Sequence, residues 1–244
     1  ILHHAASLEQ FSDSPYGDAG DYLQRYLGED YKAGFLQLVA DARRATRIPV
    51  IASINCVAAG DEWIEYAAAM AGAGASALEL NIFIQPVDAV RSSQELERLY
   101  VEIAQRVCTA VKIPVSVKLA MRFTNVVAMA GMLEGVGVKG AVLFNRFFEP
   151  DVDVERMTFV EGSPYSEASE LRNVLRTTAI CAGALPRMDF AVSTGVHDGE
   201  AAVKALLCGA AAVEVCTAIH REGFGAIARM NDWIDAWAAR HGVT

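Results

Sequence analysis

Hydrophobic and polar positions alternate in blocks along the chain from residue 48 onward. Short apolar runs of strand length are separated by longer stretches with the spacing of amphipathic helices. The predicted strands cover 49–55, 77–82, 114–119, 141–145, 190–193 and 212–216. The predicted helices cover 30–46, 61–73, 93–111, 125–135, 169–184, 198–208 and 220–241. This alternation predicts an α/β fold with a parallel sheet, either open or closed into a barrel.

The same pattern indicates a single domain over residues 1–244. Residues 1–47 offer a polar, turn-rich stretch and one helix, but no strand. Residues 146–168 interrupt the alternation of strands and helices. We expect this segment to be an insertion, a loop or a hairpin, over the carboxyl ends of the strands.

Composition narrows the class of protein. Hydrophobic residues make up 53% of the chain, which suits strands covered by helices, and the formal net charge is −9. A negative chain without clustered Lys and Arg argues against a nucleic-acid partner. The five cysteines form no CxxC pair, and neither a signal peptide nor an unbroken membrane-length apolar run is present. We therefore expect a cytoplasmic protein without a membrane span.

The tail of the chain predicts a phosphate site. Two successive strand-to-helix turns carry small residues, at Thr194, Gly195 and Val196 and again at Cys216 and Thr217. Helix N-termini present free N–H groups and a positive dipole end to anions. In a β/α barrel, the turns after the last two strands are the usual phosphate site.

Polar residues also end the other predicted strands. Asn55, Asn81 and Asn145 each follow an apolar run, and Lys118 lies inside one. A lysine in a buried strand needs a partner, so Lys118 faces either an anion or an electron-rich ring, or a buried carboxylate such as Glu79. An asparagine at a strand end is by itself often only a turn residue.

Taken in order, these motifs resemble the dihydroorotate dehydrogenase-like flavoproteins. The motifs are IPVIASIN (48–55), ALELN (77–81), IPVSVKL (113–119), VLFNRF (142–147) and STGV (193–196). Their order and spacing match from about residue 48 to residue 242. The resemblance implies a (β/α)8 TIM barrel that holds FMN at the carboxyl ends of its strands. It also implies that this chain lacks the first two β/α units, so we expect it to be a fragment.

The resemblance assigns roles to the polar residues. Lys118 would lie against the flavin ring and stabilise negative charge on the reduced flavin. Asn81 and Asn145 would hydrogen-bond the flavin or a planar substrate, and Asn55 would line the same floor. The ribityl phosphate would be held by the two tail turns, at Thr194, Gly195, Val196, Cys216 and Thr217.

The chain departs from that family at two positions. The family has a Cys or Ser base three residues after the asparagine equivalent to Asn81, but this chain has Ile84, which cannot accept a proton. Cys216 stands where the family usually has a glycine, and we interpret it as a packing residue. We therefore expect a subgroup whose substrate and electron acceptor the sequence does not identify.

Several other residues are weaker candidates. His3 and His4 have no third metal ligand at a useful spacing, so we expect no metal. His197 contacts the phosphate turn or is solvated, and Arg146 binds an acidic substrate or pairs with a carboxylate of the insertion. Trp233 and Trp237 form a helical stripe that is either core or the surface of a homodimer.

The leading functional prediction is an FMN-dependent oxidoreductase of the CH–CH donor class, related to pyrimidine biosynthesis. It would pass hydride between the flavin and a small planar or carboxylated substrate. Two alternatives stay open. One is a non-redox aldolase or synthase in which Lys118 forms a Schiff base, and the other is a non-catalytic protein on a dehydrogenase scaffold.

Overall fold

The computed structural model describes residues 29–56, 60–82, 84, 89–146, 150–160 and 162–243, except the side chains of 29–31. The predicted pair His3 and His4 lies outside these residues. The elements, in chain order, are α3 (Glu29–Ala45), β1 (Ile51–Ile54), α4 (Glu62–Gly72), β2 (Ala77–Asn81), α5 (Ser93–Ala110), β3 (Val115–Ala120), α6 (Val126–Gly135), β4 (Gly140–Asn145), β5 (Asp151–Asp153), β6 (Thr158–Val160), η1 (Ala168–Glu170), α7 (Leu171–Ala184), β7 (Asp189–Val192), α8 (Gly199–Leu207), β8 (Ala212–Val213), α9 (Thr217–Glu222) and α10 (Gly225–His241).

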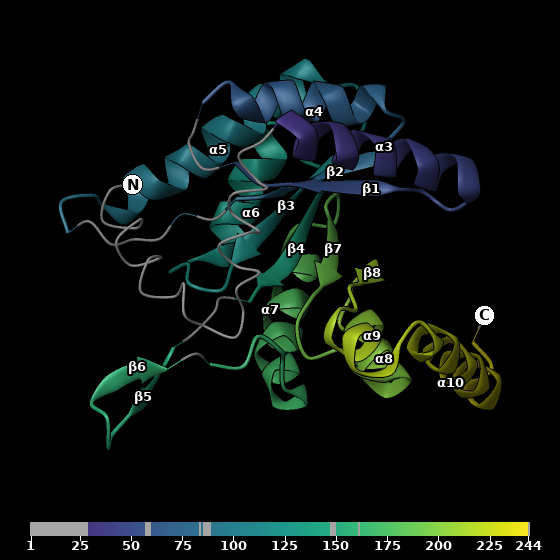
Figure 1. Cartoon of the computed structure of the whole chain (residues 1–244). Coiled ribbons are helices and arrows are strands. Elements are labelled where there is room, and N and C mark those ends of the chain that lie inside the picture. Colours follow the sequence, from purple (N-terminus) through teal and green to yellow (C-terminus); the bar gives the residue numbers. More distant parts are fainter. Residues whose placement is uncertain are drawn as a thin grey trace.

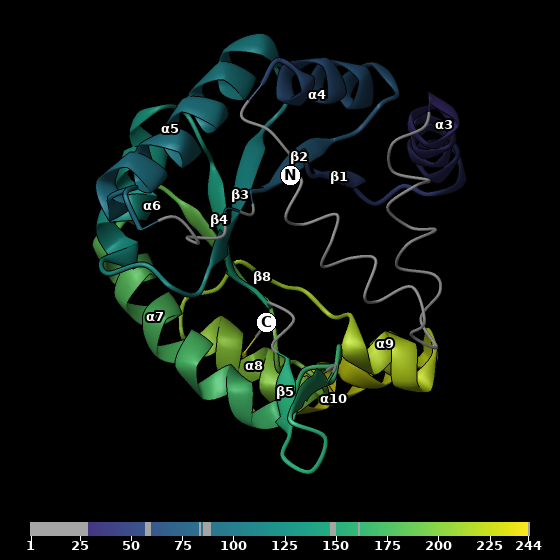
Figure 2. The ribbon, with the colours of Figure 1, turned by 60° about the vertical axis from the view of Figure 1, so that its left-hand side comes forward.

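Six strands form one parallel sheet in the order β1-β2-β3-β4-β7-β8. The sheet curls, and α4, α5, α6, α7 and α8 follow one another in an arc around its outside (Figures 1 and 2). The six predicted strands and the parallel α/β fold are confirmed. The described residues thus form a curled half-barrel, and its closure into an eight-stranded (β/α)8 barrel stays a prediction.

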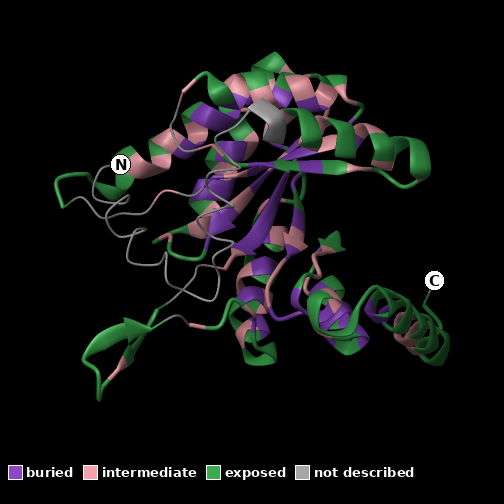
Figure 3. Ribbon diagram, viewed as in Figure 1, coloured by how far each residue is buried: buried purple, intermediate pink, exposed green. Residues whose placement is uncertain are grey.

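The two faces of the sheet differ in chemistry because successive side chains of a strand point to opposite sides. Leu78, Leu80, Val117 and Leu119 are fully buried and belong to the main hydrophobic core. The residues between them in sequence, such as Glu79 and Lys118, therefore lie on the opposite, concave face. The core fills the space between the sheet and the helices, where Figure 3 shows the strands as mostly buried.

Local signals place the helices. Ser92 and Glu95 form a capping box at the start of α5, and the Asn125 side chain accepts a hydrogen bond from the Ala128 N–H at the start of α6. Asp198 caps α8 in the same way through the Ala201 N–H. These caps satisfy N–H groups that have no partner within their helix.

The prediction of one helix over 220–241 is wrong. The structure has two helices there, α9 and α10, separated at Gly223, whose φ is 73°. A positive φ interrupts a right-handed helix, and glycine adopts it without a Cβ penalty. Helix α10 then packs against α8, with Trp233 beside Gly199, so this tryptophan is half-buried by an intramolecular contact.

The interruption after β4 contains an antiparallel hairpin of β5 and β6, in which Val152 pairs with Phe159. The hairpin stands away from the main sheet and is exposed along most of its length (Figures 1 and 3). No helix among the described residues is long and apolar enough to cross a membrane.

The contact between α8 and α10 gives a test of the packing. A Cβ on Gly199 would lie 2.6 Å from Trp233 Cβ and 2.9 Å from the Met230 carbonyl oxygen. We expect Gly199→Ala to lower the free energy of unfolding by about 1–3 kcal/mol, because backbone must move to admit the methyl group. Urea unfolding measures the change. The matched control is Gly183→Ala in α7, where a Cβ meets no atom within 4 Å and stability should rise by up to about 1 kcal/mol. Equal effects of the two substitutions would contradict the packing.

Candidate active site

Three of the predicted residues lie toward the carboxyl ends of three adjacent strands. Asn81 of β2 lies opposite Lys118 of β3 in the parallel register. Asn145 ends β4, and its Nδ2 donates to Asn81 Oδ1 at 2.7 Å. In parallel α/β sheets, ligands bind at this edge, so the structure brings these side chains together where a site is expected.

Lys118 forms an ion pair that the sequence did not predict. Its Nζ lies 2.6 Å from Glu214 Oε2, whereas the carboxylate considered from the sequence was Glu79. Glu214 directly follows β8, which is three places from β3 in the sheet. The two side chains reach each other because the sheet curls and both point to its concave face. The same signal that marked Lys118, a charge inside an apolar strand, also marks Glu214 in the run Ala212–Cys216.

Glu79 completes this cluster from β2. Its side chain is hydrogen-bonded to that of Glu214, and Ser53 Oγ donates to Glu79 Oε1 at 2.7 Å. Two carboxyl groups hydrogen-bond to each other only when one of them carries a proton. Glu79, Glu214 and Lys118 therefore form a cluster with one shared proton, which we call the carboxyl–lysine cluster.

The environment decides which carboxyl keeps the proton. Burial, the hydrogen bond with Glu214 and the negative charge of Glu214 raise the pKa of Glu79 from 4.5 to about 7. Burial also opposes ionisation of Glu214, but the hydrogen bonds from Glu79 and Lys118 and the charge of Lys118 outweigh it and lower its pKa. Between about pH 4.5 and pH 7, Glu79 is thus mostly the neutral donor and Glu214 the anion.

The predicted phosphate turn after β7 has an unusual backbone. Thr194 has a φ of 81° and Gly195 a φ of 78°. Thr194 Oγ1 donates to the Phe144 carbonyl oxygen at 3.2 Å, which ties the turn to β4. A Cβ on Gly195 would lie 2.6 Å from the Leu171 nitrogen, so only glycine fits between the turn and α7. Among the described residues, the backbone N–H groups of Gly195 and Val196 have no protein acceptor.

The two helix N-termini of the tail differ from the prediction. The carboxylate of Asp198 caps α8, so that helix end already has an anionic partner. The donors left for a phosphate are those of the turn 194–196 and the start of α9 at Cys216 and Thr217. Cys216 is exposed and its side chain makes no cap.

Ser166 links the two turns. Its N–H and Oγ both donate to Thr217 Oγ1, at 3.2 and 3.1 Å, and its Oγ lies 2.9 Å from His197 Nε2. Ser166 and Thr217 are both buried. His197 therefore has a protein partner at the edge of the predicted phosphate turn, and Ser166 is a residue that sequence reasoning missed because it lies in the insertion.

The remaining candidates are engaged elsewhere. Arg146 pairs with Glu170, its Nε lying 3.1 Å from Oε2, and donates to the Ser163 carbonyl oxygen at 2.8 Å. Asn55 is exposed at the end of β1. Ile84 packs against the core and supplies no base. No cluster of three or more His, Cys, Asp or Glu that could hold a metal occurs in the described part of the chain.

Several curated proteins resemble this chain, including two that are named dihydroorotate dehydrogenases. One, from Aeropyrum pernix, is named "Putative dihydroorotate dehydrogenase A (fumarate)" and is 30% identical over 183 residues, which cover 73% of this chain and 59% of that protein. The other, from Methanosarcina acetivorans, is named "Dihydroorotate dehydrogenase B (NAD(+)), catalytic subunit" and is 27% identical over 201 residues, covering 77% and 61%. No family model matches. The chain thus spans about three fifths of the relatives it matches, and these support the predicted relationship.

The shared proton makes stability depend on pH. The folded pKa of Glu79 lies above its ordinary value, so the folded state holds one more proton than the unfolded chain between about pH 4.5 and pH 7. The free energy of unfolding should therefore fall as pH rises through this window, and Glu79→Gln should remove that slope. Urea unfolding from about pH 5 to pH 8 measures it. Glu134→Gln, which alters an ion pair with Arg187 on the outside of the fold, should keep the wild-type slope. A slope unchanged in Glu79→Gln would show that Glu79 does not hold the proton.

Proposed function

We propose that this chain forms the flavin half-site of an FMN-dependent oxidoreductase of the dihydroorotate dehydrogenase type. Hydride would pass between the flavin and a small planar or carboxylated substrate. The observation that carries the proposal is the placement of Lys118 on the strand between those of the hydrogen-bonded Asn81 and Asn145, toward the carboxyl ends of all three strands. The similarity to two proteins named dihydroorotate dehydrogenases supports it.

The residues present fit FMN at both ends. The N–H groups of Gly195 and Val196, without protein acceptors in the described structure, suit the oxygens of the ribityl phosphate. The start of α9 at Thr217 offers further backbone donors on the next turn. At the other end, the Lys118 ammonium suits the electron-rich edge of the ring system. When bound, FMN would supply the atom that accepts or gives the hydride.

The asparagine pair has a defined polarity. Because Asn145 donates its amide N–H to the Asn81 oxygen, the Asn81 NH₂ and the Asn145 oxygen remain for a ligand. A donor beside an acceptor is complementary to an imide edge, in which an N–H lies next to a carbonyl. Such an edge is present on the flavin ring and on pyrimidine substrates. We propose that this pair orients one of them.

The proposed site has no assigned base, and one of its predicted residues lies at its rim. Ile84 packs against the core, and we infer from the resemblance that it stands where the family has its base, so we assign no described residue to proton abstraction. Asn55 is exposed, and we propose it for the rim of the site. We also propose that the protein is cytoplasmic and acts on a small-molecule substrate. We further propose that it forms a homodimer through α10, where Trp237 is half-buried beside His241.

One observation favours a second candidate function. The absence of a base at Ile84 also fits a protein that binds a flavin-like ligand without catalysis. By contrast, the Schiff-base alternative is disfavoured, because Lys118 donates to Glu214 at 2.6 Å and an ion-paired ammonium is not a nucleophile. FMN binding with no hydride transfer to or from any dihydropyrimidine would support the binding protein.

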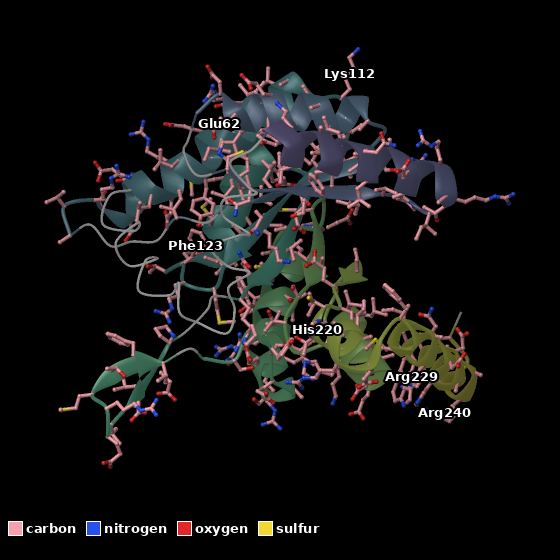
Figure 4. The ribbon with its side chains drawn as sticks, in the orientation of Figure 1. Glu62, Lys112, Phe123, His220, Arg229 and Arg240 are labelled. Atoms are coloured by element: carbon pink, nitrogen blue, oxygen red, sulfur yellow. The ribbon has the colours of Figure 1, made fainter. Side chains whose placement is uncertain are left out.

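FMN binding tests the proposal directly. We expect the purified protein to bind FMN and quench its fluorescence, and Lys118→Ala to weaken binding by about ten- to a hundredfold, the value of one charge-assisted hydrogen bond. Lys112→Ala is the matched control, because Lys112 is exposed and points away from the sheet (Figure 4). A colourless protein that does not respond to added FMN would refute the proposal.

Borohydride trapping separates the redox proposal from the aldolase alternative. A Schiff base between Lys118 and a ketone is reduced by borohydride to a stable secondary amine. We expect the intact mass to stay unchanged when the protein is treated with dihydroxyacetone phosphate and borohydride. A mass increase that is lost in Lys118→Ala would instead establish the Schiff-base chemistry.

A further inference from the structure

Lys118 is held from one side by a residue that comes from the far end of the sheet. Its Nζ contacts Glu214 Oε2 at 2.6 Å, and the two side chains are only 19% and 32% exposed. A lysine side chain has four flexible bonds, and this contact fixes where its ammonium lies. Glu214 also accepts a hydrogen bond from Ser193, the residue after β7. Its position is therefore fixed by two strands besides its own.

The second carboxyl group makes the cluster electrically neutral. Glu79 is only 7% exposed, and its Oε1 accepts from Ser53 at 2.7 Å while its proton is shared with Glu214. One ammonium, one carboxylate and one neutral carboxyl sum to no net charge. Loss of the shared proton would leave two carboxylates against one ammonium.

We infer that Glu214 is a positioning residue for Lys118, and that the proton shared by Glu79 and Glu214 keeps Lys118 able to bind an electron-rich ring. Loss of that proton weakens ring binding. This inference rests on the proposed FMN site, and it names the group that makes that site sensitive to pH.

The physical reason is electrostatic. Charges in a partly buried site interact several times more strongly than in water. An ionised Glu79 competes with the ring for the Lys118 ammonium, and its own negative charge repels the electron-rich edge of the ring. Both effects act against binding, and both are absent while Glu79 is neutral.

The groups that face Glu79 from the neighbouring strands support the role of Glu79 as the group that titrates. In the described part of the structure they are Ser53 of β1, Lys118 of β3 and Glu214 after β8. Ser53 is not ionisable at these pH values. The proton balance of the cluster therefore depends on Glu79, Glu214 and Lys118.

FMN affinity as a function of pH tests the inference. The dissociation constant is measured by fluorescence from about pH 6 to pH 9, for wild type and for Glu79→Gln. Relative to Glu79→Gln, the affinity of the wild-type protein for FMN should fall by up to about tenfold per pH unit once the pH exceeds the pKa of Glu79. The comparison is needed because the phosphate of FMN itself titrates near pH 6. Equal pH dependence in the two proteins would overturn the inference.

Two substitutions of Glu214 separate positioning from charge. Glu214→Gln keeps an oxygen that can accept from Lys118, so FMN affinity at pH 6 should stay closer to wild type than that of Glu214→Ala. Glu214→Ala removes the contact, and affinity should fall by about tenfold or more. Glu134→Gln, outside the site, should match wild type throughout. Wild-type affinity in Glu214→Ala would show that Lys118 needs no such partner.

Infrared spectroscopy of the FMN-free protein separates the failure of this inference from that of the proposed function. A protonated carboxyl band should be present at pH 6, vanish as pH rises past 7, and be absent in Glu79→Gln. If FMN binds but this band is missing, the inference fails and the proposed function stands. If the band is present and FMN binds to no variant at any pH, the proposed function fails and the inference falls with it.

Discussion

The ion pair between Lys118 and Glu214 depends on the curvature of the whole sheet. The two residues come from strands three places apart, so a flat sheet would hold them far from each other. Their contact at 2.6 Å requires each intervening strand to keep its register and its rotation. Glu79 adds a third strand to the same cluster. The cluster therefore links β2, β3 and the end of β8 across the concave face.

The concave face can carry such a cluster because the opposite face supplies the core. Leu78, Leu80, Val117 and Leu119 are fully buried against the helices, and they fix the strands that present Glu79, Asn81 and Lys118. The polar side chains that result are costly to bury unless they pair with one another. The described residues meet this condition, since no buried side-chain nitrogen or oxygen among them lacks a partner. The alternation of side chains along each strand thus places polar groups on the concave face. Because burial is costly for unpaired polar groups, these side chains pair with one another.

Lys118 and the asparagine pair lie on three adjacent strands, and the turn at Gly195 has two backbone N–H groups without an acceptor among the described residues. At Ile84, however, an apolar side chain packs into the core where a base is expected. The insertion contributes as well, because its Ser166 donates to Thr217, and Glu170, just after the insertion, pairs with Arg146.

The sequence by itself determined the six strands, most of the helices, and the strand ends at which Asn81, Lys118 and Asn145 lie, because periodicity and capping are local properties. It did not determine that α9 and α10 are separate, because a glycine within a helical pattern is compatible with a continuous helix and with the interruption that Gly223 makes here. Nor did it determine the partner of Lys118. Glu79 and Glu214 were both visible as charges in apolar strands, but only the curl of the sheet decides which carboxylate reaches the ammonium and which keeps the proton. Contacts between distant strands are set by tertiary geometry, which no local pattern encodes.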